Sequence, residues 1–292
     1  MDLKGHRLFV ASEDEPVVEV FDLRTTRLIH TITGFKKPHN VLPFPDLNEI
    51  LVVDGDASEI KILDYKSYKQ IGHIALTIDA DPVVYDPKTK YLYVVNGGRE
   101  AHTPYCLISV VDTTTGKKLA DIKLDTNRLE SMAIEKSGPR LFVNMTGTNE
   151  IGVLDREKRI MLETWPVTLG KQNVPMQLDD VNRRLFVVTR APSKVVVLDT
   201  KSGKEVTSIP AAGHADDLTY DAEHRRIYVA CGEGFITTIY QRGADDYRVL
   251  GNIPTAPGAK NARLVPELDR YYVAVPNRGA TESQILVYEV VE

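Results

Sequence analysis

Cysteine and tryptophan are scarce in this sequence. The 292 residues include two cysteines, Cys106 and Cys231, and one tryptophan, Trp165. Two cysteines allow at most one disulfide, and no CxxC pair or CxxCH haem-attachment motif is present. The cysteines belong to distant repeats of the pattern described below, so we expect no disulfide between them. A single tryptophan provides no stacking platform for a quinone cofactor, and a redox subunit is the least favoured class.

Long apolar runs and an excess of positive charge are also missing. Thirty-six Lys and Arg residues face 41 Asp and Glu residues, which gives a formal net charge of −5 at pH 7. This balance creates no overall attraction to nucleic acid or to an anionic membrane. No apolar run reaches the length of a membrane span, and the opening MDLKGHRLFV lacks the apolar core of a secretory signal. The composition predicts a soluble globular chain.

No convincing stretch of helical periodicity occurs, whereas one β-type segment recurs seven times. Each copy is a short apolar, β-branched run such as RLFVAS (Arg7–Ser12) or KYLYVVN (Lys90–Asn96), which is typical of a strand. Equivalent residues of the seven copies, here called anchors, are separated by 42 to 49 residues. The anchors are Leu8, Ile50, Leu92, Leu141, Leu185, Ile227 and Tyr271.

Three further strands accompany each anchor strand. A second strand follows it and mostly ends in an acidic residue, as in VVVLD up to Asp199. An edge-like strand comes next, and another strand precedes the anchor. Four antiparallel strands repeated every 40 to 50 residues or so match the blade of a β-propeller. We therefore predict one all-β domain over residues 1–292, a seven-bladed β-propeller. A parallel β-helix uses shorter repeats, and six or eight blades disagree with seven anchors.

The first and last blades are predicted to be incomplete in this chain. Only MDLKGH precedes the first anchor strand, and too few residues follow the second strand of the last repeat for another strand. A preceding segment of roughly 20 residues would supply both missing strands and remove the open sheet edges. The alternative is a last blade with three strands only.

The repeats resemble a known family. YVVN at Tyr93–Asn96 is close to the YVTN motif, and VVDTTTGK at Val110–Lys117 matches the continuation of YVTN repeats. Over essentially its whole length the chain resembles the YVTN-repeat seven-bladed propellers of the YncE-like group. The resemblance implies a bacterial or archaeal protein exported to the periplasm or cell surface. It implies no single function, because relatives include DNA-binding proteins, lyases, lactonases and redox subunits.

Residues at the start of each first strand are expected to line the mouth of the central channel. Counting back 11 residues from the anchors places one residue per blade there, and its sequence neighbours complete the set. The predicted mouth residues are His39, Asn40, Asp81, Glu130, Asn173, His214, Asp216, Asp217, Lys260 and Asn261. Three interpretations are open: a hydrated funnel, a ligand or divalent metal site, and a catalytic site. The metal site would use His39, Asp81, Glu130 and His214 to hold Ca²⁺, Mg²⁺ or a transition metal.

Two enlarged loops are predicted on the same face as the mouth. They span Asn96–Tyr105 and Pro276–Gln284 and carry the contact candidates Arg99, His102, Tyr105 and Arg278. Ordinary solvated loop tips are the alternative interpretation.

The sequence thus favours a non-catalytic binding or scaffold propeller, monomeric, that holds a protein or small-molecule ligand at the mouth and the enlarged loops. The alternative is a metal-assisted lyase or hydrolase at the mouth, with His39 and His214 as candidate bases. DNA binding is suggested by the resemblance, but the net negative charge does not favour it.

Overall fold

The regular structure of the chain consists of strands, apart from two single turns of 3₁₀-helix. The computed structural model describes residues 1–277 and 283–291. The 3₁₀ turns are η1 (Pro45–Leu47) and η2 (Pro266–Leu268). Contacts within the chain divide it into two compact units, Met1–Leu129 and Glu130–Glu292, each described separately below. No helix in the described ranges is long and apolar enough to cross a membrane.

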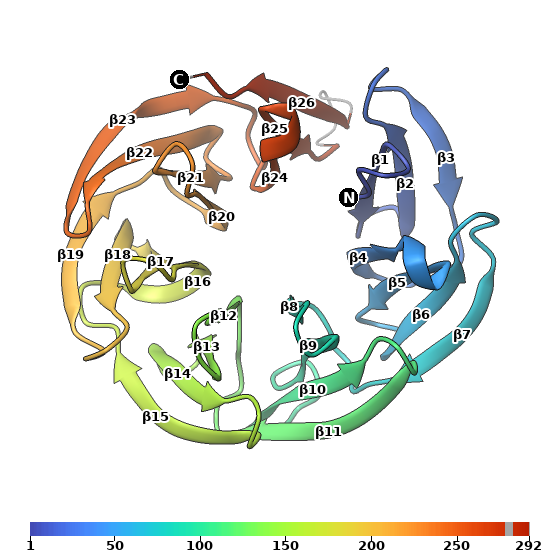
Figure 1. Ribbon diagram of the computed structural model, residues 1–292, viewed down its shortest axis with the longest axis horizontal. Helices are drawn as coiled ribbons and strands as arrows, with labels where there is room; N and C mark the ends of the chain where they lie inside the picture. The colour runs from blue at the N-terminus through green and yellow to red at the C-terminus, as the bar shows by residue number, and fades with distance from the viewer. Residues whose placement is uncertain (278–282, 292) are drawn as a thin grey trace. The chain divides into compact units, whose positions relative to one another are not determined.

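The first unit contains three antiparallel sheets, in which each strand pairs with its neighbour along the chain (Figure 1). Sheet 1 consists of β1 (Arg7–Ser12), β2 (Val17–Asp22) and β3 (Leu28–Ile32). Sheet 2 consists of β4 (Pro38–Phe44), β5 (Glu49–Asp54), β6 (Glu59–Asp64) and β7 (Gln70–Ala75). Sheet 3 consists of β8 (Val83–Asp86), β9 (Tyr91–Gly97), β10 (Cys106–Asp112) and β11 (Lys117–Leu124).

The second unit contains four sheets with the same pattern (Figure 1). Sheet 4 consists of β12 (Met132–Ile134), β13 (Arg140–Met145), β14 (Glu150–Asp155) and β15 (Ile160–Pro166). Sheet 5 consists of β16 (Lys171–Asp179), β17 (Arg184–Ala191), β18 (Ser193–Asp199) and β19 (Glu205–Pro210). Sheet 6 consists of β20 (Ala215–Asp221), β21 (Arg226–Cys231), β22 (Phe235–Gly243) and β23 (Asp246–Pro254). Sheet 7 consists of β24 (Asn261–Val265), β25 (Arg270–Val275) and β26 (Gln284–Glu289).

These seven sheets are the blades of a seven-bladed β-propeller, as predicted. In a complete sheet the four strands are named A, B, C and D in chain order, and the anchors lie on the B strands. Sheet 1 has B, C and D, preceded only by a bridge between Asp2 and Arg7. Sheet 7 has A, B and C among the described residues. The prediction of incomplete first and last blades is therefore confirmed. The prediction of a single domain stays a prediction.

The B strands read as continuous apolar runs because both of their faces are buried. In β5, Ile50 and Val52 pack into a cluster that includes residues of sheet 1, whereas Leu51 and Val53 pack into a cluster with sheet 3. Since successive side chains of a strand point to opposite faces, two neighbouring sheets require apolar residues at every position. Each fully buried Val, Leu or Ile stabilises the fold by roughly 1.5–3 kcal/mol.

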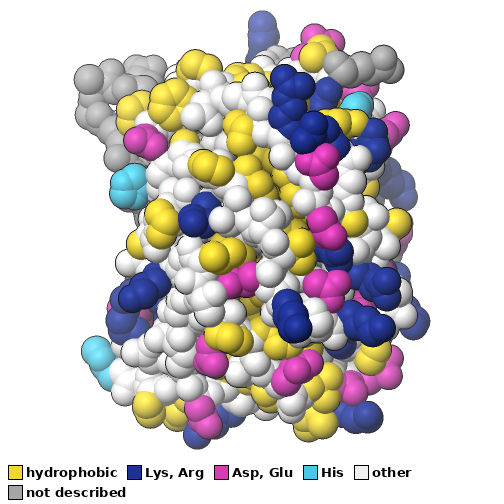
Figure 2. Space-filling view, turned by 90° about the vertical axis from the view of Figure 1, so that its left-hand side faces the viewer, with side chains coloured by type: hydrophobic (Ala, Val, Ile, Leu, Met, Phe, Trp, Pro, Cys, Tyr) yellow, Lys and Arg dark blue, Asp and Glu magenta, His cyan; other side chains and the backbone are white. Residues whose placement is uncertain are grey.

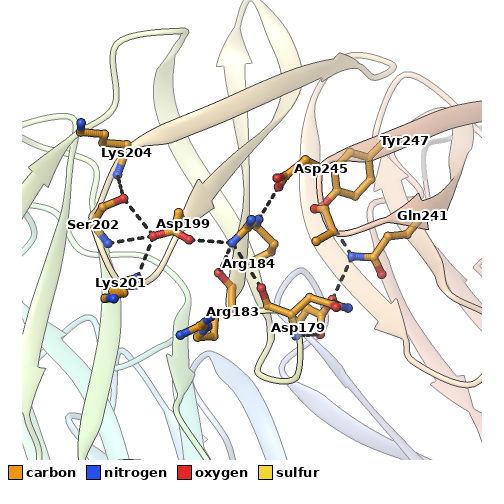
Figure 3. Close-up of polar contacts among 12 residues, drawn as sticks. Asp179, Arg183, Arg184, Asp199, Lys201, Ser202, Lys204, Gln241, Asp245 and Tyr247 are labelled. Atoms are coloured by element: carbon orange, nitrogen blue, oxygen red, sulfur yellow. Dashed lines mark hydrogen bonds and ion pairs between the residues drawn. The ribbon is translucent and has the colours of Figure 1, made fainter.

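The acidic residue that ends most C strands closes the following hairpin. In sheet 5, Asp199 Oδ1 accepts hydrogen bonds from the N–H groups of Lys201 (3.1 Å) and Ser202 (2.8 Å) (Figure 3). The main-chain oxygen of Asp199 accepts from the N–H of Gly203 at 2.8 Å, and Gly203 has a φ of +69°. The same side-chain acceptance occurs at four other C-strand ends: Asp22, Asp64, Asp112 and Asp155. These acids are turn residues.

Arginines at the start of B strands fasten neighbouring sheets to one another. Arg184 of sheet 5 contacts Asp199 of its own sheet at 2.7 Å and Asp245 of sheet 6 at 2.6 Å (Figure 3). Arg7 likewise donates to the main-chain oxygen of Tyr65 in sheet 2 at 3.1 Å. Arg140 donates to the main-chain oxygen of Thr200 in sheet 5. The arginine that begins the B strand therefore has a structural role in these three repeats.

The D strands, in contrast, expose one face. Figure 2 shows the side of the molecule on which β19 and β23 lie, and there acidic, basic and apolar side chains are interspersed. The exposed apolar residues of the second unit include Leu162 on β15, Val206 on β19 and Val249 on β23. The charges of both signs on this side provide no large field of one sign.

Candidate functional site

The loops that precede the A strands and the turns that join B to C lie at the same end of each unit, here called the loop end. In the first unit, Gly55 N–H donates to Lys37 O at 2.9 Å, and Asp79 N–H donates to Gly55 O at 3.2 Å. In the second unit, Gly232 N–H donates to His214 O at 2.9 Å, and Gly258 N–H donates to Gly232 O at 2.7 Å. The predicted mouth residues and the predicted B–C loops therefore share one end within each unit.

In the first unit, His39 at the start of β4 connects three consecutive sheets. Its Nδ1 lies 3.3 Å from Glu13 Oε1 in the B–C turn of sheet 1 and 3.4 Å from Asp81 Oδ1 ahead of β8 in sheet 3. The His39 side chain is only 6% exposed. Next to it, Asn40 Nδ2 donates to the main-chain oxygen of Asp81 at 2.5 Å. His39, Asn40 and Asp81 thus lie together in the first unit, and their place at a channel mouth stays a prediction.

The other face of the His39 ring lies against backbone. A Cβ atom on Gly55 would come within 2.9 Å of His39 Nε2 and Cδ2, so glycine is required there for the ring to fit. His39 Nε2 is buried and has no hydrogen-bond partner among the described residues. While Nδ1 is held by the two carboxylates, neither ring nitrogen is open to a substrate. This arrangement is poorly suited to a general base.

The contact between His39 and Glu13 raises the pKa of His39 and lowers the pKa of Glu13. Burial lowers the pKa of His39, but the hydrogen bond with Glu13 and the charges of Asp81 and Glu13 outweigh burial and raise it overall. The hydrogen bond with His39 lowers the pKa of Glu13 to about 2, with a further contribution from Lys37. Lys37 Nζ lies 3.5 Å from Glu13 Oε2. The cluster therefore favours a cationic imidazole beside an ionised carboxylate.

Acidic groups outnumber basic ones around this cluster. The charges of Glu13, Asp56 and Asp79 act against burial and raise the pKa of Lys37. Burial raises the pKa of Asp79, and the charge of Glu100 in the enlarged loop of sheet 3 raises it further. The loop end of the first unit is therefore an acidic surface, defined by the following carboxylates. They are Glu13, Asp56, Asp79, Asp81 and Glu100.

In the second unit, Asp216 occupies the position equivalent to His39 in a cluster of opposite polarity. Asp216 forms an ion pair with Arg190, near the end of β17 in sheet 5. Its second oxygen lies 2.6 Å from Lys260 Nζ, ahead of β24 in sheet 7. Arg190 Nε also donates to the main-chain oxygen of Ala215 at 2.8 Å. One acid between two cations again joins three consecutive sheets.

Asp217, the next residue, is half-buried and accepts two main-chain hydrogen bonds. They come from Leu218 N–H to Oδ1 at 2.8 Å and from Ala262 N–H to Oδ2 at 3.2 Å. Burial raises the pKa of Asp217 to about 6, against the opposing effect of these hydrogen bonds. Asp217 therefore links β20 to β24 at an electrostatic cost.

The remaining predicted mouth residues have different surroundings. His214 is exposed and has a φ of +60°, a left-handed conformation shared by Gln172, Asp79 and Gly258 at the equivalent positions. Asn173 is fully buried, and its Nδ2 donates to Asn144 Oδ1 at 2.8 Å, so it packs in the interior of the second unit. Glu130 is half-buried, and Asn261 is exposed on β24. Their functional roles remain predictions.

The enlarged loop of sheet 3 is ordered by hydrogen bonds. Arg99 N–H donates to Asn127 O at 3.0 Å, and Thr103 N–H donates to Gly98 O at 3.0 Å. The side chains of Arg99 and His102 are exposed. Tyr105 is half-buried under Lys123 Nζ, which lies 4.3 Å from the ring centroid. Arg278, the fourth loop candidate, lies outside the described residues.

The described ranges contain no group of three or more His, Cys, Asp or Glu side chains arranged so that it could hold a metal ion. Of the four predicted metal ligands, His39 and Asp81 lie together in the first unit. Glu130 and His214 belong to the second unit.

Two residues of the clusters, Glu13 and Arg190, were missed by the sequence reasoning. Both lie five residues after an anchor, Glu13 in the B–C turn of sheet 1 and Arg190 near the end of β17. The seven residues at this position are Glu13, Gly55, Gly97, Thr146, Arg190, Gly232 and Pro276. Glu13 and Arg190 are the charged members of that set, so a comparison of the B–C turns between repeats would have found them.

Comparisons with known proteins agree with the fold and leave the activity open. No family model matches the chain. Over 204 residues the chain is 22% identical to "Uncharacterized protein YncE" of Salmonella typhi, and the match covers 69% of this chain and 56% of that protein. The chain thus spans little more than half the length of this curated relative.

Two solved structures share the fold. One is described as "Kuenenia stuttgartiensis Hydrazine Synthase", with a TM-score of 0.84 and 16% identity over 100% of this chain and 95% of that one. The other is a functionally unknown protein from Desulfotomaculum acetoxidans, with a TM-score of 0.75 and 11% identity over 91% of this chain and 87% of that one. At these identities the likeness concerns the fold alone. The repeat sequence, the seven sheets and the match to YncE together support the resemblance of this chain to YncE-like seven-bladed β-propellers.

Proposed function

We propose that this protein is a non-catalytic binding propeller whose loop end in the first unit recognises a positively charged segment of a partner. The single observation that carries the proposal is the acidic surface around His39. The cations Lys37 and Arg99 and the imidazole of His39 lie near its five carboxylates. A surface with this many carboxylates favours cationic partners.

The local structure supports binding rather than catalysis. Glu13, His39 and Asp81 come from three sheets and hold one another, so the surface is organised before a partner arrives. The enlarged loop of sheet 3 lies beside it and contributes Glu100 and Arg99. Variable loops on a rigid strand framework are the usual place for recognition. An acidic surface also argues against nucleic acid as the partner.

Binding of a labelled hexalysine peptide, measured by fluorescence anisotropy, tests the proposal. We expect saturable binding that weakens as salt rises, because the contacts are between exposed charges. The triple variant Glu13→Gln/Asp79→Asn/Asp81→Asn should weaken binding roughly tenfold to a hundredfold, at about 0.5–1 kcal/mol per exposed charge pair.

The matched control removes three exposed acids of the second unit, Glu157→Gln/Glu223→Gln/Glu267→Gln, with the same change in net charge. This control should bind hexalysine as the parent protein does. Equal weakening by both triple variants would mean that only net charge matters, and the proposed surface would be wrong. Circular dichroism of all three proteins checks that the fold is retained.

Export to the periplasm or cell surface and a monomeric state belong to the same proposal. Export rests on the family resemblance, and the monomeric state is a prediction. Fractionation of cells that produce the natural protein would test the location, and sedimentation of the purified protein would test the monomeric state.

A further inference from the structure

Both oxygens of the Glu13 carboxylate lie beside nitrogen atoms of the chain's own side chains. Oε1 lies 3.3 Å from His39 Nδ1, and Oε2 lies 3.5 Å from Lys37 Nζ. The Glu13 side chain is nevertheless 52% exposed, so a partner can reach it. A cation of a partner that pairs closely with Glu13 therefore competes with one of these two groups.

Of the two groups, Lys37 is the one that can be displaced. The His39 side chain is 6% exposed, and its ring fits only because residue 55 is glycine. The Lys37 side chain is 35% exposed, and its ammonium group lies at the end of a flexible four-carbon stem. Rotation of that stem moves Nζ into water and leaves the main chain in place.

The main chain of Lys37 holds this ammonium group within reach of Glu13. The N–H of Lys37 donates to Asp54 Oδ1 at 2.8 Å, and the main-chain oxygen of Lys37 accepts from Gly55 N–H at 2.9 Å. Asp54 is fully buried, and its Oδ2 lies 3.5 Å from Lys61 Nζ. A cation tethered in this way has a high effective concentration at the carboxylate, so it competes with a free ligand.

Three carboxylates define the place that the Lys37 ammonium group occupies. Glu13 lies beside it in the B–C turn of sheet 1. Asp56 in the B–C turn of sheet 2 and Asp79 ahead of β8 in sheet 3 also attract it by their charges. The group that these carboxylates hold in the free protein is a primary ammonium, a compact cation that a lysine of a partner would match.

We propose that Lys37 occupies, in the free protein, the subsite that takes a lysine ammonium group of the cationic partner, and that it leaves this subsite when the partner binds. This role of Lys37 rests on the function proposed above, and it defines the chemical group that the acidic surface takes. Because the tethered ammonium group must be displaced, Lys37 lowers the affinity of the acidic surface for a cationic partner.

Binding of labelled hexalysine to the whole protein and to three variants, measured by fluorescence anisotropy at one pH and one salt concentration, tests the proposal. Lys37→Gln should bind the peptide about threefold to tenfold more tightly than the parent protein, because the competing ammonium group is gone. Lys37→Arg keeps a cation at the subsite and should show no such gain. Lys36→Gln is the matched control, because it removes the exposed neighbouring lysine with the same change in net charge. It should change the affinity by less than about twofold.

The outcomes separate this role of Lys37 from the proposed function. A gain that is confined to Lys37→Gln supports the role. An unchanged or weaker affinity of Lys37→Gln, or a gain that Lys37→Arg or Lys36→Gln shares, overturns it and leaves the proposed function standing as long as the parent protein binds. Absence of binding by the parent protein and by all three variants overturns both. Circular dichroism checks that every variant keeps the fold.

Discussion

At the scale of single residues, the same side chain type has different roles at neighbouring positions of the repeat. His39 is buried between two carboxylates, whereas His214 is exposed with a left-handed backbone. Counting from the anchors found both residues, but it could not tell which position turns its side chain inward. That difference depends on Glu13 and Gly55, which lie in other turns. The site was predictable as a set of positions, and its pairing required the structure.

The backbone of His214 gives a first prediction. A residue with a φ of +60° is strained unless it is glycine, and the equivalent residue of sheet 7 is Gly258, with a φ of +86°. His214→Gly should therefore leave the free energy of unfolding unchanged or raise it by up to about 1 kcal/mol. Urea denaturation measures this, with His214→Ala as the control that keeps the strain. A clear loss of stability in the glycine variant would show that the imidazole itself has a structural role.

Asp217 gives a prediction about pH. Because the pKa of Asp217 is raised from 3.8 to about 6 in the folded protein, the folded state binds more protons than the unfolded state between these values. The contribution of Asp217 to stability therefore falls as pH rises from about 4 to 6 and stays low above that range. Asp217→Asn removes the charge and keeps one oxygen that can accept a hydrogen bond from a main-chain N–H group.

The asparagine variant should be more stable than the parent protein at pH 7.5, by on the order of 1–3 kcal/mol, and should show no gain below about pH 4. Thermal unfolding at a series of pH values checks this. A difference between the two proteins that does not change with pH would contradict the role given to burial of the carboxylate.

At the scale of elements, the strands were predictable because they follow from local sequence patterns. The predicted strand Arg7–Ser12 matches β1 at both ends, and the predicted strand Lys90–Asn96 differs from β9 by one residue at each end. Continuous apolar runs, bounded by turn residues, fix these strands without reference to distant parts of the chain. The acid at the end of the C strand was visible in the sequence, but its role in the hairpin required the hydrogen bonds of Asp199 and its equivalents.

The hairpin of sheet 5 allows a test of this turn. Gly203 has a φ of +69°, and a Cβ atom there would come within 2.5 Å of the Trp165 ring. Gly203→Ala should lower the free energy of unfolding by about 2–4 kcal/mol, from backbone strain and the steric clash. At the equivalent place in sheet 4, Arg159 has a φ of +60°, and Arg159→Gly should be neutral or slightly stabilising. Equal effects of the two substitutions in chemical denaturation would refute this account of the turn.

The arginine contacts between sheets give a fourth prediction. Arg184→Met removes the ion pairs to Asp199 and Asp245 and retains most of the apolar stem. We expect a loss of about 1–3 kcal/mol, because half-buried charge pairs are worth more than exposed ones. The control is Arg242→Met, whose pair with Asp246 is more than half exposed on both sides and should contribute less than about 1 kcal/mol. A loss in the control as large as that of Arg184→Met would contradict a special role of the inter-sheet contact.

At the scale of the whole molecule, the repeat pattern of the sequence determines the fold but not the function. Seven anchors at nearly equal spacing specify a seven-bladed propeller. The two solved structures that share this fold at 16% and 11% identity show that very different sequences can form it. The proposed function depends on a few charged residues at the loop end, such as Glu13, and the repeat pattern does not determine their residue type. The central claim is therefore about one surface, the acidic loop end of the first unit.

Hydrogen exchange with and without hexalysine, followed by mass spectrometry, tests that claim most directly. The account predicts that the peptide slows exchange in the segments that form the acidic surface, and that the effect disappears at high salt. These segments are residues 13–16, 36–40, 54–58, 77–81 and 96–105. Protection confined to the second unit, or spread evenly over both units, would contradict the account.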